Sequence, residues 1–184
     1  NKLDDLLKRQ KKVIEASVGL AKKPVEDFTE DDDKPLKALA AQEAGLSVSF
    51  HVGGGSMGTQ FEDTAGMGWM TNFAKTSSLI FLDNIRCIGD LVFGGVCHRF
   101  PELKFVSVES GVGWLPGMIE TFDWQWRNGG VTDEHPEYDL LPSEYFRRNV
   151  YLTYINDPLG LNNLRFTGAD HFMWSGDYPH QASV

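Results

Sequence analysis

Apolar positions near the start of the chain recur at helical spacing. The residues that carry this pattern are Leu3, Leu6, Leu7, Val13, Ile14 and Val18. Such spacing predicts an amphipathic helix, which Gly19 and Pro24 can end. Residues 26–34 are charged and offer almost nothing to bury, which indicates a linker. We therefore expect residues 1–33 to be an N-terminal helical extension with a charged linker, and residues 34–184 to form one domain.

Within 34–184, helical stretches alternate with short apolar runs. Helices are expected at 35–44, 73–96, 115–127, 143–147 and about 159–166. Strands are expected at 46–51, 104–108, 149–155 and 171–174, each buried on both faces because its apolar content is continuous. Strands joined through helices run parallel, so the pattern predicts an α/β fold. Four such units are half of a closed eight-stranded barrel and leave two open sheet edges.

Ionisable residues stand where the expected strands end. Ligands of parallel sheets bind outside these carboxyl ends. His51 ends the first strand, Glu109 follows the second, and Asp177 follows the fourth, while the third runs into Asn156 and Asp157. Imidazole and carboxylate groups suit a divalent transition metal. A polar residue at one strand end usually marks only the point where the chain meets solvent, so the prediction depends on the coincidence across three strands.

The surroundings of Asp177 strengthen this prediction. Asp177 lies between Gly176 and the run Tyr178-Pro179-His180, directly after an apolar strand. A carboxylate there could bind a metal or accept a proton from metal-bound water. The alternative is a helix N-cap, since Asp is a preferred cap residue. Trp114 could line the pocket, or equally pack within the helix that follows it.

Other motifs indicate structure more than chemistry. The glycines at 53, 54, 55 and 58 lack the Gly-Lys-Ser/Thr ending of a phosphate loop, so we expect a flexible loop near a substrate. His98 precedes the second strand, on the face opposite the chemistry, and is expected to be structural. His135 and His171 are expected at the surface.

Composition excludes some classes of function. A net charge of -9 and a pI near 4.9 give a field that repels phosphate backbones and anionic membranes, so neither nucleic acid nor a membrane is an expected partner. Two cysteines in a chain of this size favour no disulfide framework and a reducing compartment. No run approaches the roughly 20 apolar residues of a membrane span. We expect a soluble, cytoplasmic protein.

Five segments resemble the amidohydrolase-related family, which includes aminocarboxymuconate semialdehyde decarboxylase and related aromatic-acid decarboxylases. They are 45–53 (GLSVSFHVG), 99–105 (RFPELKF), 109–116 (ESGVGWLP), 141–149 (LPSEYFRRN) and 173–180 (MWSGDYPH), in family order and covering about 34–184. The resemblance implies the C-terminal half, strands 5 to 8, of a (β/α)8 TIM barrel. It also implies one divalent metal, zinc foremost, with His51 as the strand 5 ligand and Asp177 as the strand 8 ligand. Glu109 stands at the end of strand 6, where decarboxylase members carry a catalytic histidine, and the His-x-His pair of strand 1 is missing.

The expected function is that of a metal-dependent hydrolase or decarboxylase acting on a small carboxylated substrate, cyclic or aromatic. Asp177 and Glu109 would be catalytic, His51 and Asp177 would hold the metal, and His180 and Trp114 would contact the substrate. The alternative is a catalytically incomplete half-barrel fragment that self-associates through its open sheet edges. A metal-free module binding an anion under the glycine loop is a third reading. Expected partners are a small-molecule substrate and either a second copy or the missing N-terminal half.

Overall fold

The computed structural model describes residues 47–53 and 66–179. They fall within the second of two units into which the chain divides, Ser47–Val184. The boundary expected near residue 34, the helices expected before it and at 35–44, Gly54, Gly55, Gly58 and His180 all lie outside the described residues.

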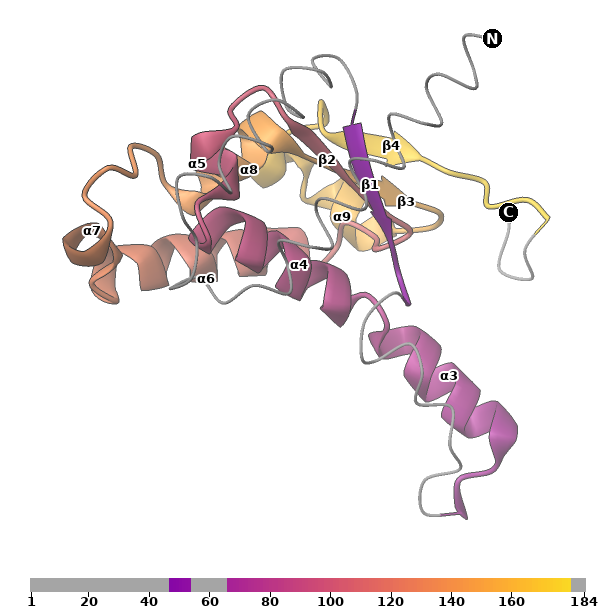
Figure 1. Ribbon diagram of the computed structural model, residues 1–184. Coiled ribbons are helices and arrows are strands. Elements are labelled where there is room, and N and C mark those ends of the chain that lie inside the picture. Colours follow the sequence, from indigo (N-terminus) through magenta and orange to yellow (C-terminus); the bar gives the residue numbers. More distant parts are fainter. Residues whose placement is uncertain (1–46, 54–65, 180–184) are drawn as a thin grey trace, which may run out of the picture. The chain divides into compact units, whose positions relative to one another are not determined.

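The described residues build one parallel sheet, whose strands lie side by side in chain order (Figure 1). The strands are β1 (Ser47–His51), β2 (Lys104–Val108), β3 (Val150–Tyr154) and β4 (Phe172–Trp174). All three strand pairs are parallel, as the alternation of helix and strand predicts. In the first pair the register runs from Ser47 with Lys104 to His51 with Val108.

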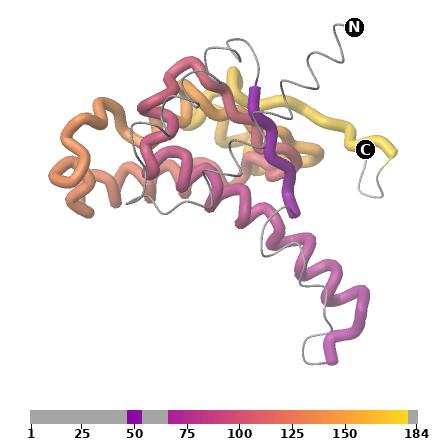
Figure 2. Tube along the Cα trace, viewed as in Figure 1, coloured from indigo at the N-terminus to yellow at the C-terminus, as the bar shows by residue number. Residues whose placement is uncertain are grey.

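Helices make every crossover between the strands, and the tube in Figure 2 shows the same path. Those between β1 and β2 are α3 (Trp69–Leu79), α4 (Leu82–Phe93) and α5 (Val96–Arg99). Those between β2 and β3 are α6 (Leu115–Asn128), α7 (Val131–Glu134) and α8 (Pro142–Asn149). Those between β3 and β4 are α9 (Pro158–Asn162) and α10 (Leu164–Thr167).

The helical region expected over 73–96 is helical but divided between α3, α4 and the start of α5, because the chain turns twice within it. One turn lies at residues 80–81, and the other lies at Gly94 and Gly95. Gly95 has a φ of 71°, and a Cβ there would lie 2.2 Å from the Tyr138 hydroxyl. Only glycine fits both the left-handed backbone and this close approach, so the helix must end before it.

The two faces of the sheet differ in what covers them. Side chains on one face belong to the hydrophobic core, namely Val48, Phe50, Phe105, Val150, Leu152, Tyr154 and Phe172. They pack with helix residues such as Ile88, Leu115 and Trp126. The alternate positions, which point to the other face, include Ser49, Val106, Val108, Tyr151 and Met173, and none of these belongs to that core.

The expectation that every strand is buried on both faces is therefore wrong for the outer strands. Ser47, Ser49 and His51 of β1 are exposed, and Met173 and Trp174 of β4 are exposed. The continuous apolar content of these strands did not reveal this, because composition does not say how many faces the rest of the chain covers. In the part of the chain that the structure describes, the helices cover one face only.

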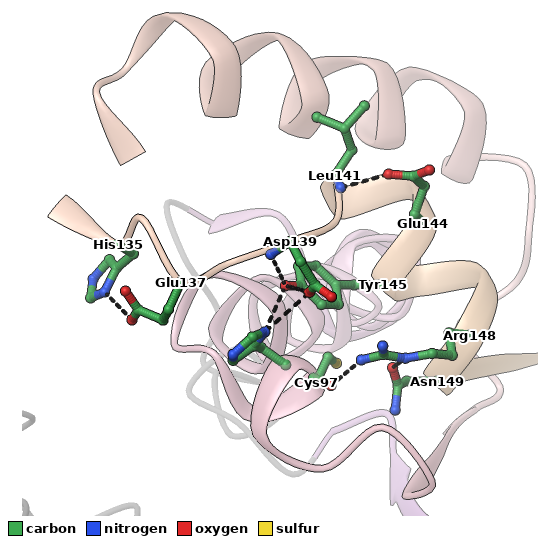
Figure 3. A network of polar contacts seen from close by, with 10 residues as sticks. Cys97, His135, Glu137, Asp139, Leu141, Glu144, Tyr145, Arg148 and Asn149 are labelled. Atoms are coloured by element: carbon green, nitrogen blue, oxygen red, sulfur yellow. Dashed lines mark hydrogen bonds and ion pairs between the residues drawn. The ribbon is translucent and has the colours of Figure 1, made fainter. Parts of the chain in front are cut away.

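A polar network ties the amino ends of β2 and β3 together (Figure 3). The hydroxyl of the fully buried Tyr145 donates to Asp139 Oδ1 at 3.0 Å, and His98 Nδ1 lies 3.1 Å from that hydroxyl. Asn149 donates from Nδ2 to the carbonyls of Phe100, Pro101 and Leu103, at 3.1, 3.2 and 2.7 Å. We call His98, Asp139, Tyr145 and Asn149 the amino-end network.

The remaining histidines differ from one another in their surroundings. His98 has the structural role that was expected of it, as part of the amino-end network. His135 is partly exposed and stacks on Tyr138 with ring centroids 4.6 Å apart. His171 is also partly exposed: its ring lies on Tyr151 and its Nδ1 is 3.0 Å from the Val150 carbonyl oxygen.

Candidate active site at the carboxyl ends of the strands

His51 and Glu109 meet where β1 and β2 end. His51 pairs with Val108 in the ladder, so Glu109 is the next residue along the neighbouring strand. His51 Nε2 lies 2.9 Å from Glu109 Oε1. The imidazole is largely exposed, at 57% of its side-chain area, whereas the glutamate is at 19%. The pair thus exposes its imidazole ring to solvent while most of its carboxylate side chain is shielded.

The hydrogen bonds of His51 define which ring nitrogen carries a proton. Nδ1 lies 2.8 Å from the Val52 carbonyl oxygen, which can only accept, so Nδ1 donates. The pKa of His51 is raised, first by this carbonyl and then by the Glu109 and Asp177 carboxylates, against partial burial, which lowers it. A carboxylate oxygen also accepts, so the 2.9 Å contact with Glu109 places a proton on Nε2, and in the protonated ring both nitrogens donate.

Asp177 lies at the opposite edge of the sheet, three residues beyond β4, and its Oδ2 is buried. In a flat sheet three strand spacings would separate β1 from β4 by roughly 14 Å. The Asp177 charge nevertheless contributes to the raised pKa of His51. Asp177 thus stands at the same carboxyl ends of the strands as His51 and Glu109. We call His51, Glu109 and Asp177 the strand-end site.

Both carboxylates of this site stand on strained backbone. Glu109 has a φ of 61° and Asp177 a φ of 52°. Among the described residues these are the non-glycine residues with positive φ. Such conformations cost free energy in residues with a Cβ and cluster at active sites and ligand clamps. No helix begins at the Tyr178 and Pro179 that follow Asp177, so the described residues do not support the N-cap alternative.

Two residues at the end of β3 hold the loop that carries Glu109. Thr153 Oγ1 accepts the Glu109 N–H at 2.7 Å. Asp157 Oδ2 accepts the N–H groups of Val112 and Gly113, at 2.6 and 2.7 Å, while its Oδ1 accepts that of Gly160 at 2.9 Å. Asp157 is therefore a structural carboxylate. The sequence placed Asp157 at a strand end but gave no signal for Thr153, since a threonine is an ordinary strand residue.

Trp114 is tied into the loop and the core. Its Nε1 donates to the Ser110 carbonyl at 2.9 Å, and its ring packs against the core cluster. These contacts are those of the packing alternative. His180, the other expected substrate contact, lies outside the described residues.

The donors of the strand-end site fit part of a metal centre. A metal-binding histidine usually donates its second ring N–H to a carbonyl or carboxylate, as Nδ1 of His51 does toward Val52. An imidazole nitrogen and a carboxylate oxygen are both ligands that zinc accepts. Over residues 47–53 and 66–179, no three side chains of His, Cys, Asp or Glu are grouped closely enough to hold an ion by themselves.

Comparisons with known proteins identify the family. The family model described as Amidohydrolase matches residues 17–183, a match that begins before the boundary expected near residue 34. No curated protein matches the chain. No helix in the described part of the chain is long and apolar enough to cross a membrane.

Two solved structures share the fold. An amidohydrolase from Mycobacterium avium subsp. paratuberculosis K-10 is 24% identical with a TM-score of 0.59, over 85% of this chain and 38% of that one. The 5-carboxyvanillate decarboxylase from Sphingomonas paucimobilis is 26% identical with a TM-score of 0.51, over 79% of this chain and 42% of that one. The chain thus spans well under half the length of these relatives. With a family match over nearly its whole length, the chain belongs to the amidohydrolase family.

Proposed function

We propose that this chain supplies strands 5 to 8 of a (β/α)8 enzyme, a metal-dependent hydrolase or carboxy-lyase acting on a small carboxylated, cyclic or aromatic compound. The observation that carries the proposal is the pairing of an imidazole with a carboxylate at the carboxyl ends of two adjacent parallel strands, with His51 Nε2 2.9 Å from Glu109 Oε1. Active sites of barrel enzymes occupy this end of the strands.

The uncovered sheet face supports the half-barrel part of the proposal. Parallel sheets are normally covered on both faces. In a closed barrel the inner face is filled by side chains from all the strands. Here Ser49, His51 and Met173 are exposed on the face away from the core, and among the described residues the outer edges of β1 and β4 have no strand beside them. Four further strands, from a missing N-terminal half or from a second copy, would cover both the face and the edges.

In the loaded enzyme His51 Nε2 and Asp177 would hold the ion. A bound divalent ion supplies Lewis acidity toward a substrate oxygen or a water molecule. The carbonyl of Val52 keeps a proton on Nδ1, so Nε2 is the nitrogen that would give up its proton and donate its lone pair to the ion. Two donors bind an ion weakly, so the proposal requires further ligands from the strands that close the barrel.

Glu109 would hold or move a proton next to this pair. Its Oε1 lies at hydrogen-bond distance from a ring nitrogen at the open end of the sheet, which is the reach that general acid–base work requires. The side chain is mostly shielded while its partner is exposed, so a substrate would approach from the His51 side. Trp114 and His180 remain proposed substrate contacts.

Metal analysis together with a measurement of size tests the proposal. The 184-residue chain is purified with zinc, and its metal content and molar mass are measured. One zinc per assembled barrel, lost in His51→Ala and in Asp177→Asn, is the expected result. His135→Ala is the matched control, because His135 also pairs with a carboxylate, Glu137 at 3.2 Å, but outside the strand-end site. An assembly of barrel size without zinc, or equal zinc in all variants, would contradict the proposal.

The reaction itself is tested with a carboxylated aromatic probe. A relative of known structure is a 5-carboxyvanillate decarboxylase, so release of CO2 from 5-carboxyvanillate is one assay. Hydrolysis of small lactones and cyclic amides is the other. Glu109→Gln should lower whichever rate is found by about 100-fold or more, as expected for loss of a proton-transfer group.

The alternative is a catalytically incomplete fragment that self-associates through its sheet edges. The observation that favours it concerns the possible metal ligands: no three of them lie close enough together, among the described residues, to bind an ion. It predicts a dimer that contains no zinc and turns over neither probe.

A further inference from the structure

The backbone of Glu109 has an unusual support. Along β2 the main chain pairs with β3 up to Ser107 and Leu152. Beyond that point the Glu109 N–H donates to the side-chain Oγ1 of Thr153 at 2.7 Å, whereas the main-chain oxygen of Thr153 accepts from Gly111 at 3.2 Å. Thr153 thus accepts hydrogen bonds from two backbone N–H groups of the same loop, that of Glu109 with its side chain and that of Gly111 with its main chain.

This arrangement explains how Glu109 can leave the ladder. A φ of 61° turns its N–H and carbonyl away from regular strand pairing. The Thr153 hydroxyl accepts the displaced N–H at a site where Thr153 is 9% exposed, so water has little access to replace it. A buried N–H that loses its acceptor is costly, so the hydroxyl stabilises the left-handed conformation.

The residues on either side of Glu109 have anchors of their own. Ser107 donates its hydroxyl to Ser110 Oγ at 2.7 Å, and Asn84 donates to Ser107 Oγ at 2.9 Å. Asp157 holds Val112 and Gly113. These contacts fix the path of the loop but make no contact with Glu109 itself, so the direction of the Glu109 side chain is left to Thr153.

We infer that Thr153 is a positioning residue, whose hydroxyl holds Glu109 in the left-handed conformation that aims its carboxylate at His51 Nε2. Thr153 comes from a strand whose own end carries no member of the strand-end site. As a role in catalysis the inference rests on the proposed function. As a statement about the His51–Glu109 contact it does not, because that contact joins two side chains of this chain.

Isosteric variants test the inference. Thr153→Val removes only the acceptor, and Thr153→Ser keeps the hydroxyl. Thr121→Val is the matched control, because Thr121 is an exposed α6 residue whose hydroxyl donates to the Gly117 carbonyl. In the metal-free chain the ¹⁵N shifts of the His51 ring and the exchange rate of the Glu109 amide are measured by NMR. Zinc affinity is measured by competition with a chromophoric chelator.

In Thr153→Val we expect the His51 ring shifts to move to the values of Glu109→Gln and the Glu109 amide to exchange at least about 10-fold faster. Zinc affinity should change in Thr153→Val in the same direction as in Glu109→Gln, because the hydroxyl acts on the site only through Glu109. Thr153→Ser and Thr121→Val should stay near wild type. Wild-type ring shifts in a folded Thr153→Val would overturn the inference. If a wild-type assembly of barrel size binds no zinc, the proposed function fails, and the ring shifts still decide the role of Thr153.

Discussion

Two pairs of histidine and carboxylate lie at opposite ends of the same strands and are built in different ways. At the amino ends, His98 and Asp139 are 3.2 Å apart, and both contact the hydroxyl of the buried Tyr145. At the carboxyl ends, His51 and Glu109 are 2.9 Å apart, with the imidazole largely exposed. The amino-end pair exposes its carboxylate, with Asp139 at 66% and His98 at 27% of their side-chain areas, and two aromatic rings, Tyr138 and Tyr145, lie beside His98. The strand-end pair does the reverse, since it exposes its imidazole and shields its carboxylate.

The difference shows that a pair of residue types does not by itself define a site. The amino-end network lies on ordinary backbone and closes the loop before α8, a stabilising role that fits the amino-terminal face of a barrel. The strand-end site places two carboxylates in the left-handed region. The amino ends of the strands thus stabilise the fold, whereas the strained backbone at the carboxyl ends destabilises it. This distribution is expected when chemistry is confined to the carboxyl ends.

The largest expected effect is on the amino-end network. Tyr145→Ala should lower the free energy of unfolding by about 3–5 kcal/mol, because it empties the site of a fully buried aromatic ring. Denaturant unfolding followed by tryptophan fluorescence measures this. Tyr178→Ala is the control, since Tyr178 is 88% exposed, and it should stay within about 0.5 kcal/mol of wild type. Should Tyr145→Ala not fold, Tyr145→Phe removes the hydroxyl alone, at about 1–2 kcal/mol.

A change of the opposite sign is expected at the strand-end site. Glu109→Gly should raise the free energy of unfolding by about 1 kcal/mol, because glycine adopts a φ of 61° without the penalty of a Cβ. The same variant should lose the proposed activity. Glu109→Val is the matched opposite, since a β-branched residue should be strongly disfavoured there. A Glu109→Gly protein that unfolds more easily than wild type would contradict the claim that the backbone of Glu109 is strained.

A smaller effect concerns the pH dependence of the amino-end network. The Tyr145 hydroxyl and then His98 lower the pKa of Asp139 below its ordinary value of 3.8. A lowered carboxyl pKa adds stability that is present above 3.8 and is lost as the pH falls through the lower folded value. The stability gap between wild type and Asp139→Asn should therefore narrow below about pH 4. Asp133→Asn, in α7, is the control, and a gap that widens toward low pH would contradict the assignment.

The smallest effect is a difference in thiol reactivity. Burial raises the pKa of Cys97 to about 12 and that of Cys87 to about 11. Both thiols should therefore stay protonated at pH 8 and react slowly with Ellman's reagent in the folded chain, Cys97 more slowly than Cys87. Cys97 precedes His98, so its rate should rise in Tyr145→Phe if the amino-end network covers it, while the rate of Cys87 should not change.

The sequence predicted the sheet better than the helices. The bounds 104–108 of β2 are those expected, because an apolar run between a proline turn and a glycine loop leaves little choice. The helix expected at 73–96 is divided, since the turn at Gly95 depends on the approach of Tyr138 from a distant part of the chain. Contacts of this kind are not visible in local periodicity.

The strand-end site was only partly predictable, for a related reason. The position of His51 and Glu109 at adjacent strand ends follows from the order of elements, and the structure brings them together. The left-handed backbone of Glu109 and its support by Thr153 depend on pairing between segments that are 44 residues apart. Neither glutamate nor threonine carries a local signal for such a conformation.

The register of the β1–β2 ladder has a consequence for how this chain can vary. Successive side chains of a strand point to opposite faces of the sheet. The register that pairs Ser47 with Lys104 therefore also pairs His51 with Val108. Slipping this ladder by one residue would turn the imidazole toward the helices while leaving every member of the strand-end site in the sequence. Insertions and deletions should therefore be tolerated in the connections between elements. An insertion or deletion within β1 or β2 should abolish activity, even where no residue of the strand-end site is altered.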